Sequence, residues 1–328
     1  MPENIIQWDK YNQLMTNMGH LSRESGKVTE VIGMLIRGNV DLTTYTPTGG
    51  TTYSNNVYFL NAAAVLKTSR LFIKGGIRPT WDQGKLNVLP DVLVDVHLQE
   101  KKIILTGGWT GHVRKNTYQF LASQNPWINQ PLSQFNTRIT ELYGGFKGTL
   151  ANSFNYRVLG GFIEYLHLPL FSNHIQPGLF EVVREGKLQA LHFQSEVGFV
   201  LQDRFNASAK IDIYNFVRQQ DEARPWHITP IELTAALRWQ PTKKIMVKTD
   251  LFGWQGAAYR KDIAGNSARL PAVFDLNAGM EFKVHQLISV WGQFNNIFNN
   301  TYQRWNNYQV VGFNLLAGIR LTFDQKQN

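Results

Sequence analysis

The stretch GFNLLAGIRLTF, at residues 312–323, decides the fold class of this chain. Apolar residues occupy every second position from 311 to 323: Val311, Phe313, Leu315, Ala317, Ile319, Leu321 and Phe323. The positions between them are glycine, polar or charged, except for Leu316. Such alternation is typical of a β-strand, and it is longer than the usual soluble strand of about 5–6 residues. It suits the roughly 9–11 tilted residues with which a strand crosses a bilayer, with one face toward lipid and the other toward a wet lumen.

The same alternation recurs along most of the chain. It is clearest in five further segments, which are 88–98, 103–114, 189–201, 228–240 and 272–284. Similar patterns cover 71–79, 206–217, 243–255 and 287–298, and noisier strand-like sequence covers 29–45, 56–67, 137–149 and 155–168. These segments predict about fourteen strands with no convincing amphipathic helix between them. The expected fold class is therefore all-β, an antiparallel transmembrane outer-membrane β-barrel.

The connections between these segments alternate in length. Short turns are expected at 67–70, 99–102, 202–205, 240–243 and 284–287. Long loops are expected at 46–55, 80–87, 115–136, 169–188, 218–227, 256–271 and 299–310. Short turns on one rim and long loops on the other are typical of outer-membrane barrels. This order requires the apolar patch 179–183 to form a hairpin within a loop; if the patch is a spanning strand, the topology shifts by one.

Composition excludes several classes of function. The chain has no cysteine, which rules out disulfides, thiolate metal sites and cysteine nucleophiles. Its net charge is +9, but lysine and arginine are scattered, so no nucleic-acid partner is expected. No metal-protease or nucleophile-elbow motif is present, so we expect no enzyme activity, no catalytic residues and no cofactor. A pairing of His97 with His112 across adjacent strands is the only metal hypothesis, and no metal site is expected.

The C-terminal segment resembles a known family. An Asn-x-Phe-Asn-x-x-Tyr-like box occupies 296–302, Gly312 opens the last strand, Gly318 lies within it, and Phe323 closes it. This arrangement resembles the last two strands of TonB-dependent outer-membrane receptors, and 272–284 looks like the strand before them. The resemblance is close over roughly 270–323, and the rest of the chain matches the family only in its general pattern of strands and loops. It implies the cell outer membrane as location and uptake of a scarce nutrient, such as a siderophore or an oligosaccharide.

The resemblance also implies partners and an assembly signal. The partners are outer-membrane lipid and the barrel-assembly machinery, which would read Gly318, Leu321 and Phe323 in the last strand. A plug domain and TonB would be partners only if a missing N-terminal segment supplied the plug. No signal peptide, plug or TonB-contacting box is visible in the sequence, and Leu316 and the polar tail 324–328 depart from the family pattern.

Two accounts of the chain follow. The first is the C-terminal part of a barrel of about 22 strands, as in the family. In that account residues 1–28 are the tail of an outer loop with a possible partial strand, 29–323 are barrel, and 324–328 are a polar tail. The alternative is a complete small barrel of about fourteen strands, serving as a passive channel or as a structural subunit of a membrane assembly.

Ligand selectivity is expected in the long loops, because loops on a rigid scaffold carry function. Aromatic and amide-rich sequence nominates six candidate ligand-binding residues: Tyr302, Arg304, Trp305, Tyr308, Tyr118 and Trp127. The competing interpretation is that these loops pack on themselves. For the polar side chains of the lumen, the competing interpretation is that opposite charges pair across neighbouring strands.

Overall fold

The computed structural model describes residues 14–16, 21–25, 28–100, 102–131, 133–151, 153–173, 178–201, 204–262 and 265–323. Its main sheet begins with β1 (Leu14–Thr16), β2 (Leu21–Ser25), β3 (Val28–Asp41), β6 (Val57–Lys67), β7 (Leu71–Asp82), β8 (Lys85–Gln99), β9 (Ile103–Arg114) and β10 (Thr137–Leu150). It continues with β11 (Phe154–Asn173), β12 (Phe180–Leu201), β13 (Phe205–Gln219), β14 (Ile231–Thr242), β15 (Ile245–Trp254), β18 (Val273–His285), β19 (Ile288–Asn295) and β22 (Asn314–Leu321).

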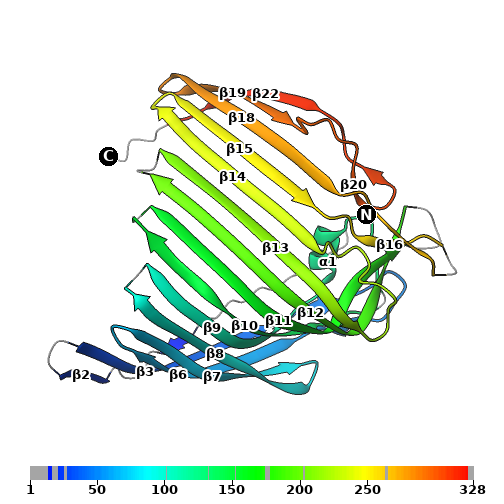
Figure 1. The fold of residues 1–328 in the computed structure, drawn as a ribbon. Coiled ribbons are helices and arrows are strands. Elements are labelled where there is room, and N and C mark those ends of the chain that lie inside the picture. The colour runs from blue at the N-terminus through cyan, green and yellow to red at the C-terminus, as the bar shows by residue number, and fades with distance from the viewer. Residues whose placement is uncertain are drawn as a thin grey trace.

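From β3 to β22 each strand of the main sheet pairs with the main-sheet strands before and after it in the chain, and all of these pairings are antiparallel. This path contains the fourteen strands that the alternation predicts, so the predicted fold class and strand number are confirmed. The short strands β1 and β2 both pair with β3. Figure 1 shows the strands side by side in a curved sheet, from blue β3 to red β22. Over the described strands the sheet is open, with no ladder between β22 and β3.

The two faces of the sheet differ as the alternation predicts. Large apolar side chains on the outward face are exposed, among them Met280 at 54%, Leu315 at 57% and Ile319 at 69%. The inward face carries polar groups that pair across strands. Four of these ion pairs are Lys74–Asp91 at 2.6 Å, Lys147–Asp95 at 2.8 Å, Arg157–Glu196 at 2.7 Å and Arg320–Glu281 at 2.7 Å. An apolar outer surface over a polar, charge-paired lining is the arrangement of a barrel wall in a bilayer.

The loops lie on one rim and the short turns on the other, with two exceptions to the expected lengths, 80–87 and 169–188. Residues 80–87 are not a long loop, because the ladder of β7 and β8 continues to Asp82↔Lys85. Gln83 and Gly84 make the turn with φ angles of 48° and 80°. Two consecutive residues with positive φ give the two-residue turn whose twist matches a hairpin, and glycine accepts this geometry without strain.

The remaining loops carry small elements of their own. The expected long loop 169–188 is shorter than predicted, because β11 and β12 stay paired to Asn173↔Phe180. Residues 180–183 of the apolar patch therefore lie in the hairpin of these two strands, and the topology does not shift. The other loops contain the strand pairs β4 (Thr44–Tyr45) with β5 (Tyr53–Ser54), β16 (Ala258–Arg260) with β17 (Ser267–Arg269), and β20 (Gln303–Trp305) with β21 (Tyr308–Gln309). The expectation of no helix was wrong at one place, where α1 (Tyr118–Gln124) lies within the curve of the sheet (Figure 1). No described helix is long and apolar enough to cross a membrane.

The outward face makes a stability prediction. Met280→Arg should lower the free energy of unfolding in lipid vesicles by about 2 kcal/mol, because it places a cation in the apolar band of the wall. Thr234→Arg, on the inward face of β14, should change the free energy by less than about 1 kcal/mol. Urea titration of both variants in vesicles measures the difference. Equal losses for the two variants would show that the outward face does not contact lipid.

Candidate ligand-binding site

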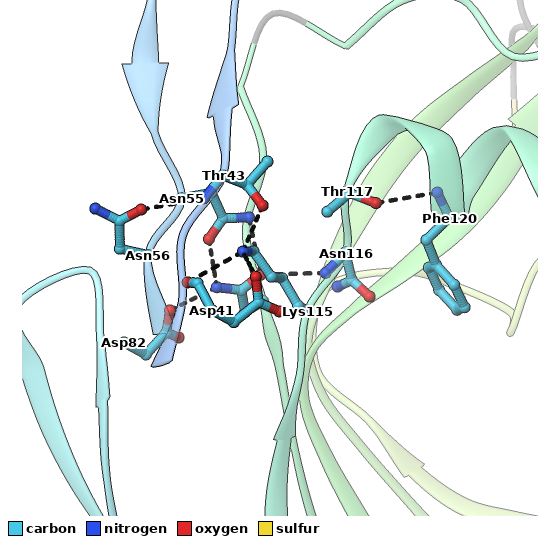
Figure 2. Close-up of polar contacts among 10 residues, drawn as sticks. Asp41, Thr43, Asn55, Asn56, Asp82, Lys115, Asn116, Thr117 and Phe120 are labelled. Atoms are coloured by element: carbon cyan, nitrogen blue, oxygen red, sulfur yellow. Dashed lines mark hydrogen bonds and ion pairs between the residues drawn. The ribbon is translucent and has the colours of Figure 1, made fainter. Parts of the chain in front are cut away.

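A polar network ties the 115–136 loop to the loop-side ends of β3, β7 and β10. Lys115 forms an ion pair with Asp41 at the end of β3, and its Nζ donates to the Thr43 hydroxyl at 2.6 Å (Figure 2). The next residue, Asn116, is buried, and its Nδ2 donates to the Thr137 hydroxyl at 2.8 Å. These bonds fix the start of the loop to strands that are far apart in the sequence.

Asn136, also buried, closes the network at the other end of the same loop. Its Nδ2 donates to Asn55 Oδ1 at 2.7 Å and to Asp82 Oδ1 at 2.6 Å. Between the two anchored ends, Thr117 caps α1 by accepting a hydrogen bond from the Phe120 backbone N–H at 3.1 Å (Figure 2). The network therefore holds α1 in place inside the mouth of the sheet.

An aromatic cluster forms the roof above the lumen. Trp305 is 9% exposed and packs edge-on against Phe171 and Phe180, with ring centroids 5.1 and 5.6 Å apart. Beside it, Trp127 stacks on Tyr308 with centroids 3.5 Å apart, and the Tyr308 hydroxyl donates to the Gly178 carbonyl. The rings come from three separate loops, so aromatic packing joins those loops into one layer.

A charged group lies at the edge of this roof. Arg304 Nη2 lies 3.0 Å from Glu232 Oε1, and its guanidinium stacks over Trp254 at 5.3 Å from the ring centroid. Tyr302 packs edge-on against the same tryptophan at 5.3 Å. Burial raises the pKa of the Tyr302 hydroxyl, with a further contribution from Asp275, so this group stays protonated. The group presents a planar cation with one carboxylate partner.

His227 lies between the roof and the sheet. It is 5% exposed, its Nδ1 lies 2.6 Å from the Phe171 carbonyl, and its ring packs edge-on against Phe180 at 5.0 Å. Burial lowers its pKa to about 4, although the Phe171 hydrogen bond opposes that shift, so the ring is neutral at pH 7. Because Nδ1 must donate to a carbonyl, Nε2 is an acceptor, and it has no hydrogen-bond partner among the described residues.

Some of these groups line a cavity of about 400 Å³ in the mouth of the sheet. Its wall includes Arg114 from β9, Tyr165 from β11, Tyr214 from β13, and, from the loops, His227, Arg304 and Trp305. Arg114 stacks over the Phe120 ring at 5.5 Å, and its Nε is buried with no hydrogen-bond partner among the described residues. The cavity thus combines aromatic walls, two guanidinium groups, the Glu232 carboxylate that pairs with Arg304, and one imidazole acceptor without a hydrogen-bond partner among the described residues. This is the composition of a small-molecule site.

The structure brings some predicted site residues together and separates others. Trp305 and Arg304 line the cavity, while Trp127 and Tyr308 lie in the roof as each other's partners. Tyr302 braces Trp254, and Tyr118 packs against Tyr45 with centroids 5.9 Å apart. The loops therefore do pack on themselves, and their binding role stays a prediction.

Sequence reasoning missed three cavity residues, His227, Tyr165 and Tyr214. Tyr165 and Tyr214 lie on β11 and β13 and line the cavity beside polar neighbours. An aromatic residue at an inward-facing position breaks the alternation of apolar outward and polar inward residues, and this exception is the signal that could have found them. His227 follows Trp226 between two prolines, Pro225 and Pro230, which is the only local signal of a rigid loop. The surroundings of its Nε2, which has no hydrogen-bond partner among the described residues, are set by Phe171, Phe180 and Trp305. These residues lie far from His227 in the sequence, so no local sequence pattern predicts this acceptor.

The proposed assembly signal lies on the last strand. A Cβ at Gly318 would lie 2.7 Å from the Trp291 ring of the neighbouring strand, so glycine permits this close contact. Leu321 and Phe323 are 59% and 82% exposed. This geometry leaves both side chains accessible, and recognition by assembly machinery remains a prediction.

The metal hypothesis is wrong in its geometry. His97 pairs with Ile104 near the short turns, whereas His112 pairs with Ile139 near the loops. Across the described residues, no group of three metal-ligating side chains gathers.

Comparison with solved structures bears on the fold. No protein-family model matches the sequence, and no curated protein matches it significantly. The siderophore receptor PirA from Acinetobacter baumannii matches 93% of this chain with 53% of its own, at a TM-score of 0.65 and 10% identity. A variant of the ferric enterobactin receptor PfeA from Pseudomonas aeruginosa, in complex with enterobactin, matches over 93% of this chain and 53% of its own length, with a TM-score of 0.62 and 12% sequence identity. The outer membrane transporter YddB from Escherichia coli matches over 92% of this chain and 53% of its own length, with a TM-score of 0.58 and 10% sequence identity.

The chain has the fold of an outer-membrane receptor barrel. The expectation from the last two strands, that the chain folds like the C-terminal part of a TonB-dependent receptor barrel, is confirmed. The chain spans about half the length of the solved structures it matches. Its cavity lies at the loop rim, beneath the elements that roof the mouth of the sheet.

Proposed function

We propose that the chain supplies the wall and outer loops of a nutrient-uptake receptor in the outer membrane, with the cavity as its ligand site. The observation that carries this proposal is the pocket of about 400 Å³ beneath the loops. Support comes from the apolar outward face and from neighbours described as receptors and transporters, one of them in complex with enterobactin. The proposed role is binding and uptake, and not catalysis.

The cavity's chemistry suggests the class of ligand. Arg114 and Arg304 favour an anionic group, and Arg114 has no carboxylate partner among the described residues. Tyr165, Tyr214 and Trp305 offer aromatic surface, and His227 Nε2 accepts a hydrogen bond from a ligand N–H or O–H. The proposed ligand is an anionic, partly aromatic organic molecule, such as a siderophore. Energised uptake through TonB would further need a plug domain.

Binding should fall when the unpaired cation is removed. Arg114→Gln should weaken the affinity for an anionic siderophore at least about tenfold, because it removes a charge-assisted contact from the wall of the cavity. Arg218→Gln, an exposed arginine outside the cavity, should leave the affinity within about twofold. Tryptophan fluorescence titration with a panel of ferric siderophores and anionic oligosaccharides measures both. The proposal fails if no member of the panel binds, or if both variants bind like the unaltered chain.

A further inference from the structure

We propose that the chain carries a specific site for one anionic phospholipid on its outward face, across β12 to β15 beside the short turns. This site lies on the opposite face of the wall from the ligand cavity. It rests on the proposed membrane location and not on the nutrient that the cavity takes.

The first observation is an apolar groove of about 380 Å³ in the outward face. Small side chains form its floor, since Ala207 and Ala209 of β13 face Leu237 and Ala235 of β14. Phe199 of β12 and Leu251 of β15 flank this floor, and almost all of the lining is apolar. A floor of alanines between larger walls makes a channel in the surface, and its chemistry suits a lipid acyl chain.

The second observation is a group of cations at the nearest turns. Arg204 lies in the β12–β13 turn, three residues before Ala207, which is about 10 Å along a strand. Lys243 and Lys244 form the neighbouring β14–β15 turn, and the Arg204 carbonyl accepts from the Gln240 backbone N–H at 2.7 Å, which joins the two hairpins. All three side chains are exposed, and no ion pair links any of them to another described residue.

The position of these groups identifies the occupant. Short turns of outer-membrane barrels face the periplasm, where the adjoining leaflet presents phosphate headgroups at the depth of the turns. Trp239 lies between the groove and the turn and is 46% exposed, as expected of an aromatic at the membrane interface. An acyl chain in the groove would place its phosphate beside Lys243 and Lys244. The charge complementarity selects an anionic headgroup over a zwitterionic one.

Native mass spectrometry of the full chain in detergent micelles tests this site. Phosphatidylglycerol should be retained at one molecule per chain, and phosphatidylcholine with the same acyl chains should bind at least tenfold more weakly. Lys243→Gln and Lys244→Gln should each weaken phosphatidylglycerol binding about fivefold. Ala235→Phe should abolish retention by filling the groove. Ala64→Phe, at another exposed outward position, is the matched control and should have no effect.

Equal binding of the two lipids, or unchanged binding in both lysine variants, would overturn the proposal. So would equal retention by the Ala235→Phe and Ala64→Phe variants. The lysine variants keep the test decisive even if the groove-filling variant does not fold. Failure here leaves siderophore binding at Arg114 intact, so the two proposals fail separately.

Discussion

Glu185→Ala is expected to lower the free energy of opening the 220–230 loop by about 4 kcal/mol. The Glu185 carboxylate is fully buried, and it accepts hydrogen bonds from four backbone N–H groups. These come from Lys187 at 3.1 Å, Gln220 at 2.8 Å, Asp221 at 3.0 Å and Glu222 at 2.8 Å. Removing the carboxylate leaves these donors without their shared acceptor, and three of them belong to the loop that carries His227.

Hydrogen exchange at the amides of residues 220–222 measures this opening. Glu196→Ala is the matched control, since Glu196 lies on the same strand and forms an ion pair with Arg157 in which each side chain is 45% exposed. Exposed ion pairs contribute about 0–1 kcal/mol, so the control should leave the loop protected. Similar exchange in both variants would contradict the role assigned to Glu185.

Acidification should loosen the roof of the cavity through His227. Burial lowers the pKa of this imidazole from 6.5 to about 4. Between these pH values His227 is therefore protonated in the unfolded loop and neutral in the folded one. Stability is therefore complete above about pH 6.5 and declines as the pH falls toward 4. The shift corresponds to about 3 kcal/mol lost at the acid end.

His227→Asn should remove most of this pH dependence. The asparagine amide keeps a donor, and asparagine tolerates the left-handed backbone at this position, where φ is 58°. The variant should be less stable at pH 7, because it loses ring packing against Phe180 and Trp305. Tryptophan fluorescence of the loops, followed from pH 8 to pH 4, tests the prediction. A transition below pH 6.5 that is equally strong in the variant would assign the effect to other groups.

The sheet was predictable because lipid and lumen impose opposite chemistry on alternate residues. The exposed Leu315 and Ile319 on one face of β22 reflect this directly. Length predictions failed where the signal was short: the 83–84 turn is only two residues, and α1 is 7 residues long. A helix of that length has too few turns to show an amphipathic period.

The candidate site was predictable in composition and not in arrangement. Aromatic residues such as Trp127 and Tyr308 mark loops that do more than connect strands. Their stacking on each other depends on how loops from distant parts of the sequence meet above the sheet, as does the burial of His227. No local pattern encodes such meetings, because they are set by the curvature of the whole wall.

The strict pairing of each long strand with its neighbours in the chain makes the wall modular. From β3 onward, the two strands of every ladder are joined by a single turn or loop. The described sheet can therefore form one hairpin after another, and no strand has to insert between two strands that are already paired. A nick in an outer loop would leave all ladders whole. Variation at the mouth can therefore accumulate without disturbing the scaffold beneath it.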